Sequence, residues 1–399
     1  MEDVFLFDAI RSPRAKGKPG GGLSSLLPHE LVAQLFTALR SRNGAAAVDA
    51  VDSFTLSCVG QIGAQGGHLA LVSKLESGLP DTVAAQTINN FCVGGMTALG
   101  NTFASVRSGQ IELGLAGGVE MMSQVGFLAD GASYYTNEDV SASLRYAPVG
   151  VAADHLAFHH GVERPELDAL AMESHARAAA AWDDGRYDRH VVPITGADGV
   201  VMSIDETIKR DFTPEGLAAL DPVFEGMGTH TYDKVLTGDD SVVIEHRHTI
   251  AHCPPIADGA ALTLVGTAKA GERFDLKPLA RIDAIAEAGG SPLEQLTAGE
   301  SAMAKVLERT ETTLNEMDVI EYMEAFAVVP ALFHRHHDVD RTKVNPNGGH
   351  LAMGHPMGAT GAILVSALAH ELHRIGGRSG IAVAHGGSGV GAATILSRP

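Results

Sequence analysis

The chain has 399 residues, and 45% of them are hydrophobic, enough for two or three domain-sized cores. Its net charge of −19 argues against nucleic acid or an anionic membrane surface as a main partner. The three cysteines are widely spaced and indicate neither a disulfide framework nor a zinc site. The first apolar run precedes the basic residues, the reverse of a signal peptide, and no stretch is long enough to span a bilayer. We therefore expect a cytoplasmic protein.

The first part of the chain alternates between strand-like and helix-like runs. The pattern predicts strands at 4–9, 51–60, 82–91 and 111–117, and helices at 28–40, 67–76 and 93–107. Strands that alternate with helices are typical of a parallel sheet with helices on its faces. We therefore expect an α/β fold.

The pattern changes near residue 120 and resumes later. Helical runs at 150–160 and 165–185 stand in otherwise irregular sequence, and a strand returns at 259–266. The second α/β stretch predicts strands at 279–286, 319–325, 380–385 and 392–396, and helices at 300–309, 328–337 and 362–374. The two similar stretches favour an internal duplication. The boundaries that we expect are a first half at 1–119, an inserted loop domain at 120–250, a return strand at 251–270 and a second half at 271–399.

Cys92 follows a strand-like run and precedes two glycines and a helical pattern. A helix N-terminus carries about half a positive charge, which favours thiolate over thiol. The small residues at 94 and 95 allow a substrate carbonyl to approach the backbone N–H groups closely. Cys92 is either a nucleophile or a small core residue, since free cysteines are usually buried.

His355 lies in a loop of small residues, NPNGGHLAMGHPMGATG, at 345–361. A histidine at this point can accept a proton from a thiol or stabilise a developing oxyanion. The pairing of a cysteine in one half with a histidine in the other favours a catalytic role over a structural one.

Several stretches, from one end of the chain to the other, resemble the thiolase family of acetyl-CoA acetyltransferases and 3-ketoacyl-CoA thiolases. The matching stretches are DAIRSPRAKG, NNFCVGGMTAL, LAGGVEMMS, DGAALTLVG, MEAFA, NPNGGHLAMGHPMGATG and HGGSGVGAA. The resemblance implies a thiolase fold, with two duplicated βαβαβαββ halves, a layered αβαβα core and an inserted loop domain. It also implies a homodimer or homotetramer that acts on acyl-CoA or another acyl thioester. Coenzyme A would be substrate or product, with no metal and no separate cofactor.

The same resemblance implies roles for individual residues. Cys92 matches the nucleophile that takes the acyl group, and His355 matches the base that activates it. The backbone N–H groups of Cys92 and Gly387 match the donors of an oxyanion hole. Glu324 is interpreted as a hydrogen-bonding support for the catalytic loops.

Two positions depart from the family pattern at the catalytic centre. The family's second catalytic cysteine is replaced by His385, whose unperturbed pKa is about 6.5 against about 8.5 for cysteine. The asparagine or histidine that helps to form the other oxyanion hole is replaced by Met323, which cannot donate a hydrogen bond. We list His385 as an acid–base candidate and Met323 as a supporting residue.

The loop domain departs from the family as well. Asp221 stands where the family often uses arginine towards coenzyme A, and this change would repel a phosphate. Pro148 and Pro254 take the places of a substrate-facing histidine and of a serine near the pantetheine. The histidines at 334, 336 and 337 are interpreted as a solvated helix end rather than a metal cluster.

The sequence therefore predicts a thiolase-type acyltransferase that cleaves or forms the C–C bond of a 3-oxoacyl-CoA through an acyl-cysteine. Two alternatives stay open. The first is a condensing or acyl-transfer enzyme with a different carrier or acceptor. The second is a catalytically weak scaffold subunit.

Overall fold

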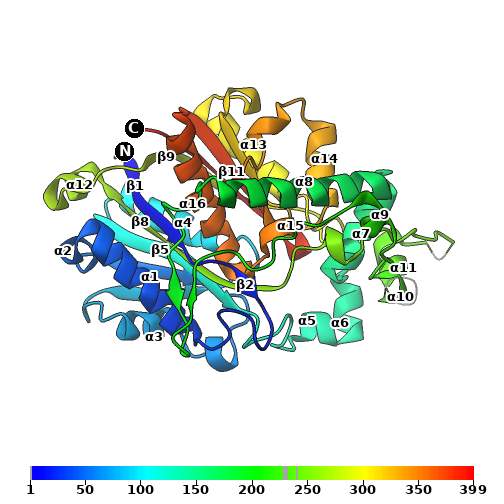
Figure 1. Ribbon diagram of the computed structural model, residues 1–399, viewed down its shortest axis with the longest axis horizontal. Helices are drawn as coiled ribbons and strands as arrows, with labels where there is room; N and C mark the ends of the chain where they lie inside the picture. The colour runs from blue at the N-terminus through cyan, green and yellow to red at the C-terminus, as the bar shows by residue number, and fades with distance from the viewer. Residues whose placement is uncertain (1, 228–231, 240) are drawn as a thin grey trace.

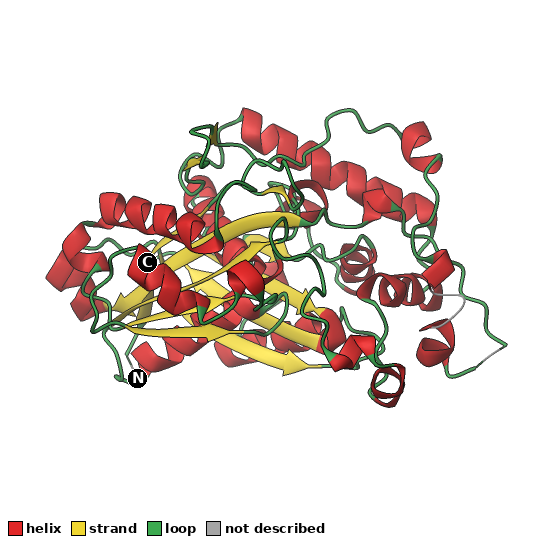
Figure 2. Ribbon diagram, turned by 90° about the horizontal axis from the view of Figure 1, so that it is seen from below, coloured by secondary structure: helices red, strands yellow, loops and turns green. Residues whose placement is uncertain are grey.

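The computed structural model describes residues 2–227, 232–239 and 241–399. Its main sheet contains the strands Val4–Arg11 (β1), Ala15–Lys16 (β2), Ser53–Ser57 (β3), Ala84–Ile88 (β4), Leu113–Met121 (β5), Ala257–Thr267 (β8), Ala280–Gly289 (β9), Val319–Tyr322 (β10), Ser379–Gly386 (β11) and Val390–Ser397 (β12). The order across the sheet is β10-β11-β12-β9-β1-β8-β5-β3-β4, with β2 beside β8. Helices flank the strands in both views (Figure 1, Figure 2).

The sheet consists of two halves with the same plan. From the central seam outward, the first half runs β1, β8, β5, β3, β4, and the second runs β9, β12, β11, β10. In the second half, Val344 takes the position that β4 has in the first half. It forms a single parallel bridge with Ile320. The halves join where β1 pairs antiparallel with β9. The duplicated plan is confirmed, with one strand of the second half reduced to a bridge.

The expected parallel sheet is a mixed sheet. The parallel pairs are β3–β4, β3–β5 and β10–β11, whereas β8 and β12 run antiparallel to the strands beside them. Only residues 387–389 separate β11 from β12. A connection this short joins antiparallel strands, because a parallel crossover needs a dozen residues or more.

The helices of the two halves complete a layered core. They are Pro28–Asn43 (α1), Ala45–Val48 (α2), Leu69–Glu76 (α3), Gly94–Arg107 (α4), Ala268–Phe274 (α12), Ala298–Thr310 (α13), Val328–His336 (α14), His350–Met353 (α15) and Met357–Ile375 (α16). Both α4 and α16 contact strands of the two halves and lie between them, while α1 and α3 cover the outer face of the first half and α13 that of the second. The core is therefore layered α-β-α-β-α.

Glycines bring α4 and α16 into backbone contact. A Cβ atom on Gly95 would stand 2.6 Å from the amide nitrogen of Ala362, and one on Gly361 would collide with the amide nitrogen of Met96. Only glycine permits this approach. The contact fixes the N-terminal ends of the two helices against each other, and these are the ends that follow Cys92 and His355.

The excursion between β5 and β8 carries Ser133–Thr136 (α5), Glu138–Ser143 (α6), Val149–His159 (α7), Arg164–Asp183 (α8), Ile194–Thr195 (β6), Val201–Met202 (β7), Pro214–Ala218 (α9), Glu225–Met227 (α10) and Asp233–Thr237 (α11). Most of these helices lie at the end of the molecule away from the termini (Figure 1). A buried bidentate ion pair, Arg11 to Asp205 at 2.8 and 2.9 Å, ties the excursion to β1.

Several element boundaries differ from the prediction. Helix α16 begins at Met357 rather than at 362, and α15 lies within the stretch predicted as a loop. The glycines that predicted a loop there serve the close helix packing instead. Strand β10 ends at Tyr322 rather than at 325, and α12 was not predicted.

Candidate active site

Cys92 lies in the turn between β4 and α4. The preceding Phe91 has a φ of +45°, in the left-handed region, and its N–H donates to Asn89 Oδ1 at 3.0 Å. Such a conformation costs roughly 1–3 kcal/mol for a residue with a side chain, so the surrounding structure must hold it. Gly94 opens α4 against Ser57, whose Oγ would collide with any Cβ at that position. The turn thus presents Cys92 at the start of α4.

The Cys92 thiol is protonated at neutral pH. Burial is the largest effect and raises its pKa to about 12. The N–H groups of Gly387 and of Cys92 itself point to the sulfur and lower the pKa, whereas the Glu120 carboxylate raises it. The expectation that the start of α4 holds the sulfur ionised is wrong, because desolvation outweighs the partial charge of the helix. The two N–H groups aimed at the sulfur are those that the family resemblance assigns to an oxyanion hole.

His355 lies immediately before α16 and is held on both sides. Its N–H donates to Pro255 O at 2.9 Å, and its Nδ1 lies 2.7 Å from Thr360 Oγ1. The Thr360 hydroxyl donates to Pro356 O at 3.3 Å, so it accepts the Nδ1 proton and leaves Nε2 as a free acceptor. Burial, with Arg14 adding to it, lowers the pKa of His355 to about 3. The ring is a neutral imidazole, the form that a general base requires.

The two halves place Cys92 and His355 at equivalent points. Each residue stands two positions before the first residue of its helix, α4 or α16, and the glycine contact joins these helix ends. The side chain of Glu120 links the same region by accepting the N–H of Gly358 at 3.0 Å. Within the described residues, no hydrogen bond joins the thiol to the imidazole directly.

Gly387 stands at the end of β11, in the turn to β12. A Cβ on the neighbouring Gly386 would lie 3.5 Å from the backbone nitrogen of Cys92, so this turn packs against the nucleophile's own backbone. Ser388 follows with a φ of +61°. Its N–H donates to Gln295 Oε1 at 3.0 Å. The structure therefore brings two of the predicted groups together, Cys92 and the N–H of Gly387. His355 lies two positions before α16, whose first turns contact α4.

His385 lies on the other side of β11. A Cβ on Gly380 would meet Leu368 of α16, and residues of opposite parity, His385 among them, face away from α16. The His385 ring is fully buried, its Nδ1 accepts the N–H of Gly299 at 3.2 Å, and it packs edge to face on Tyr322 at 4.8 Å between centroids. Burial lowers its pKa to about 4. This placement does not support the acid–base role expected for His385.

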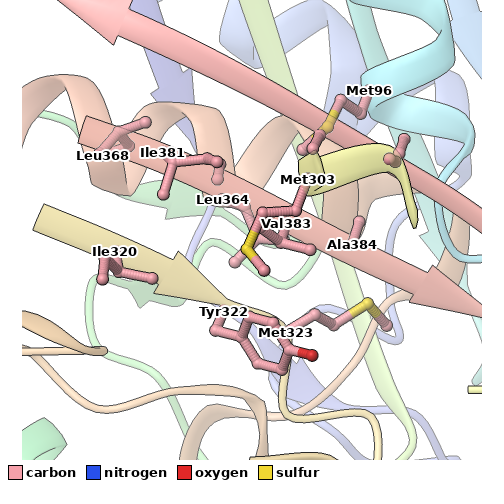
Figure 3. Packing of buried hydrophobic residues seen from close by; sticks show 14 of the residues in the cluster. Met96, Met303, Ile320, Tyr322, Met323, Leu364, Leu368, Ile381, Val383 and Ala384 are labelled. Carbon is pink, nitrogen blue, oxygen red and sulfur yellow. The ribbon is translucent and has the colours of Figure 1, made fainter. Parts of the chain in front are cut away.

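Met323 and Glu324 occupy the loop after β10. Met323 is fully buried beside Val383 and Ala384 (Figure 3), and its sulfur accepts the N–H of His385 at 3.3 Å. It supplies no hydrogen-bond donor. The Glu324 carboxylate accepts the Ser174 hydroxyl at 2.7 Å and, at 3.1 Å, the N–H of Leu351 in the His355 loop. This agrees with the supporting role expected for Glu324.

The three residues of the excursion that differ from the family pattern differ in their exposure to solvent. Asp221 is exposed between α9 and α10 and forms no ion pair within the described residues. Pro148 is half-buried and immediately precedes α7. Pro254 is also half-buried, and the carbonyl of its neighbour Pro255 accepts the His355 N–H. Of the three, Pro254 lies next to the proposed base.

The histidines at the end of α14 form no metal centre. His337 Nε2 pairs with Glu300 Oε2 at 2.8 Å, and burial lowers the pKa of His334 to about 4. In the described part of the chain, no group of three or more His, Cys, Asp or Glu side chains is arranged to hold a metal. Over the same residues, no helix is both long and apolar enough to cross a membrane.

Glu120 is one of two residues near the site that the sequence analysis did not single out. This fully buried carboxylate accepts the N–H of Val59 at 2.9 Å, of Gly60 at 3.0 Å and of Gly358 at 3.0 Å. It thereby ties the turn after β3 to the start of α16. The signal was present as a single acidic residue in the apolar stretch LAGGVEMMS.

Arg14 is the second such residue. Its guanidinium is fully buried, donates to Gly354 O at 3.2 Å and contacts Met353 Sδ at 2.8 Å. Burial lowers its pKa to about 10, so it stays charged at neutral pH and opposes protonation of His355. The sequence placed Arg14 in a basic loop, and nothing local indicated its burial.

Comparison with known proteins identifies the family. Family models match residues 4–238 as the thiolase N-terminal domain and residues 276–398 as the thiolase C-terminal domain. The chain belongs to the thiolase family. This thiolase is 34% identical to the β-ketoadipyl-CoA thiolase of Pseudomonas aeruginosa, over 99% of each chain. It is 32% identical to an acetyl-CoA acetyltransferase of Synechocystis, over 100% of each.

Solved structures agree with this assignment. The thiolase superposes on human mitochondrial 3-ketoacyl-CoA thiolase with a TM-score of 0.85 at 29% identity, covering 100% of this chain and 99% of the other. Against the acetyl-CoA acetyltransferase of Bacillus anthracis the TM-score is 0.86 at 30% identity, with the same coverage. The thiolase fold and the acyltransferase class expected from the sequence are confirmed.

Proposed function

We propose that this thiolase cleaves a 3-oxoacyl-CoA with CoA through an acyl thioester on Cys92. The observation that carries the proposal is the convergence of two backbone N–H groups, of Cys92 and Gly387, on the Cys92 sulfur. A carbonyl oxygen of an acyl group on that sulfur would meet the same donors. The neutral His355, at the start of the adjoining helix, supplies the base.

Acylation needs two proton transfers and one bond exchange. His355 Nε2 takes the thiol proton while the sulfur attacks the 3-oxo carbon of the substrate. The C2–C3 bond then breaks, its electron pair goes to C2, and the acyl group stays on Cys92. The CoA thiol subsequently attacks this thioester and gives its proton to His355 Nε2. The acyl group leaves as a new acyl-CoA, and His355 returns the proton to the Cys92 sulfur.

The carbon at C2 must receive a proton, and the buried His385 is not placed to give it. His355 becomes an imidazolium when it accepts the thiol proton, and we propose that it returns that proton to C2. Met323 offers no donor to the thioester oxygen, so the only donor in this proposal is the Nε2–H that His355 gains with the thiol proton. Cleavage of the C2–C3 bond, which is part of acylation by a 3-oxoacyl-CoA, therefore depends on this one histidine.

A second candidate follows from the same two residues. With His385 packed away from α16 and Met323 without a donor, the chain keeps the acylation groups better than the groups for C–C chemistry. Asp221 would also repel the phosphates of coenzyme A. The second candidate is therefore acyl transfer from a thioester to a different carrier or acceptor.

One experiment separates these functions. The purified enzyme is mixed with acetoacetyl-CoA, with and without CoA, and both thiolysis and the mass of the intact chain are followed. Mass gain on wild type but not on Cys92→Ser, together with thiolysis, supports the first function. Gain of an acetoacetyl group on Cys92 without thiolysis supports the second, because an acetyl group would itself report cleavage of the C2–C3 bond. A chain that gains no mass refutes both and leaves a scaffold role.

We further propose a homo-oligomer, for which the edge of the sheet offers support. Strand β4 pairs with β3 on one side only, and the adjacent α3 exposes Leu71, Val72 and Leu75, the last at 61%. An unpaired edge beside exposed apolar side chains is suited to a second copy of the chain. Sedimentation velocity of wild type and Leu75→Asp tests this proposal. A role in fatty acid metabolism, a cytoplasmic location, and the boundaries at 119, 250 and 270 stay predictions.

A further inference from the structure

Ser388 adopts a conformation that its residue type does not favour. Its φ of +61° and ψ of +16° lie in the left-handed region, between two glycines. Glycine adopts this region without the steric cost that a Cβ brings. A serine at this point indicates that a contact of its side chain offsets the energy of the backbone strain.

The contact comes from the excursion. The Tyr134 hydroxyl donates to Ser388 Oγ at 2.8 Å, and the Ser388 N–H donates to Gln295 Oε1 at 3.0 Å. The Gln295 amide in turn donates to Ala147 O at 2.7 Å. Tyr134 and Ala147 both belong to the excursion, so two independent connections join it to the turn after β11.

Neighbouring residues of the excursion hold the Tyr134 ring and backbone in place. Its ring packs edge to face on Tyr146 at 4.9 Å between centroids, and its carbonyl accepts the Ser141 hydroxyl at 2.9 Å. Tyr146 is 7% exposed, so the ring that Tyr134 leans on belongs to the core of the excursion. The phenol therefore reaches Ser388 from a supported position.

The turn that Tyr134 holds also carries the Gly387 N–H. Gly387 immediately precedes Ser388, and its N–H points to the Cys92 sulfur. The peptide plane that carries the Gly387 N–H shares the Gly387 Cα atom with the plane that carries the Ser388 N–H, so a displacement of Ser388 would shift the Gly387 N–H. A hydrogen bond to the Ser388 side chain restrains this displacement.

We propose that Tyr134 and Ser388 form a latch through which the excursion positions the Gly387 N–H for acylation of Cys92. Tyr134 is a positioning residue in this proposal, since it acts through Ser388 and touches no reacting atom. The inference rests on the proposed acyl transfer at Cys92. It adds that the oxyanion donor of the second half is set by a residue of the inserted segment.

The matched variants are Tyr134→Phe and Tyr135→Phe. Tyr135 belongs to the same aromatic cluster, 5.9 Å from Tyr146, and its hydroxyl forms no hydrogen bond within the described residues. Rapid mixing with acetoacetyl-CoA, quenching and intact mass give the rate of Cys92 acylation and its dependence on substrate concentration. We expect Tyr134→Phe to lower the maximal rate about tenfold, with half-saturation within about twofold of wild type, whereas Tyr135→Phe behaves as wild type.

Ser388→Gly separates the latch from general stability. It removes the hydroxyl and the left-handed strain together, so we expect slow acylation with a melting temperature at or above that of wild type. Tyr134→Phe combined with Ser388→Gly should acylate no more slowly than either single variant, because both remove the same bond.

The outcomes distinguish the latch from the proposed function. Wild type that fails to acylate overturns the proposed function, and the latch with it. Wild type that acylates, with Tyr134→Phe equal to Tyr135→Phe, overturns the latch alone. Additive losses in the double variant, or a loss in half-saturation rather than in maximal rate, also overturn it.

Discussion

Replacement of Thr360 by valine tests whether the His355 ring is oriented for catalysis. Thr360 is fully buried, and its hydroxyl lies 2.7 Å from His355 Nδ1. Valine keeps the shape and removes the acceptor. The loss is largest in the transition state, where the ring becomes an imidazolium and the bond becomes charge-assisted, worth about 1.5–3 kcal/mol. The resting state loses a neutral hydrogen bond worth about 0.5–1.5 kcal/mol, so the barrier rises by the difference, roughly 1–1.5 kcal/mol. At 1.36 kcal/mol per factor of ten, acylation of Cys92 should slow by roughly 5- to 13-fold.

Thr102→Val is the matched control. Thr102 is also a buried helical threonine, and its hydroxyl donates to the carbonyl four residues earlier, Ala98 O at 3.1 Å, as that of Thr360 does to Pro356 O. Both variants are measured by quenched-flow intact mass for acylation and by urea unfolding for stability. Equal acylation rates for Thr360→Val and Thr102→Val would refute the orientation of His355 by Thr360.

Three further results follow from the pKa values. Burial lowers the His385 pKa to about 4, whereas the unfolded chain takes up that proton near 6.5. At pH 5, His385→Leu should therefore relieve about 2 kcal/mol of destabilisation by acid and leave acylation unchanged. Slow acylation in this variant would instead support a catalytic role for His385. Burial lowers the His246 pKa, but Asp154 and Asp233 raise it by more, so the net shift is upward. The stability lost in His246→Gln should therefore be larger at pH 6 than at pH 8. A larger loss at pH 8 would contradict the upward shift. Alkylation of Cys92 by iodoacetamide should keep accelerating above pH 9, and a plateau near pH 7 would show that the thiolate is already formed.

Much of the fold could be predicted because local patterns and tertiary packing agree. The helix at 28–40, with Leu31, Leu35 and Leu39 on one face, is α1, and these three side chains are fully buried. The start of α16 could not be predicted in the same way. Glycine breaks helices in local statistics, but Gly358 and Gly361 lie in α16, where glycine allows close packing.

The site residues also differ in whether local sequence or the tertiary fold determines their place. Cys92 and His355 stand in short motifs whose residues are neighbours in sequence, so the pattern pointed to them directly. Arg14 acts on His355 from more than 300 residues away, and its burial depends on a fold that no local window contains. The acid–base role of His385 stays a prediction that its placement does not support. Its motif position indicated a catalytic residue, but a bulkier ring in place of cysteine packs into the outer layer with Tyr322.

The resting enzyme keeps the proton on sulfur, and this constrains how acylation proceeds. Burial raises the pKa of the Cys92 thiol to about 12 and lowers that of His355 to about 3, so both shifts favour the neutral pair over a thiolate–imidazolium pair. We therefore expect the proton to leave as the C–S bond forms, so that negative charge develops on the substrate oxygen rather than on sulfur. The N–H groups of Cys92 and Gly387 then stabilise that oxygen, and burial, which suppresses the free thiolate, also strengthens these two hydrogen bonds.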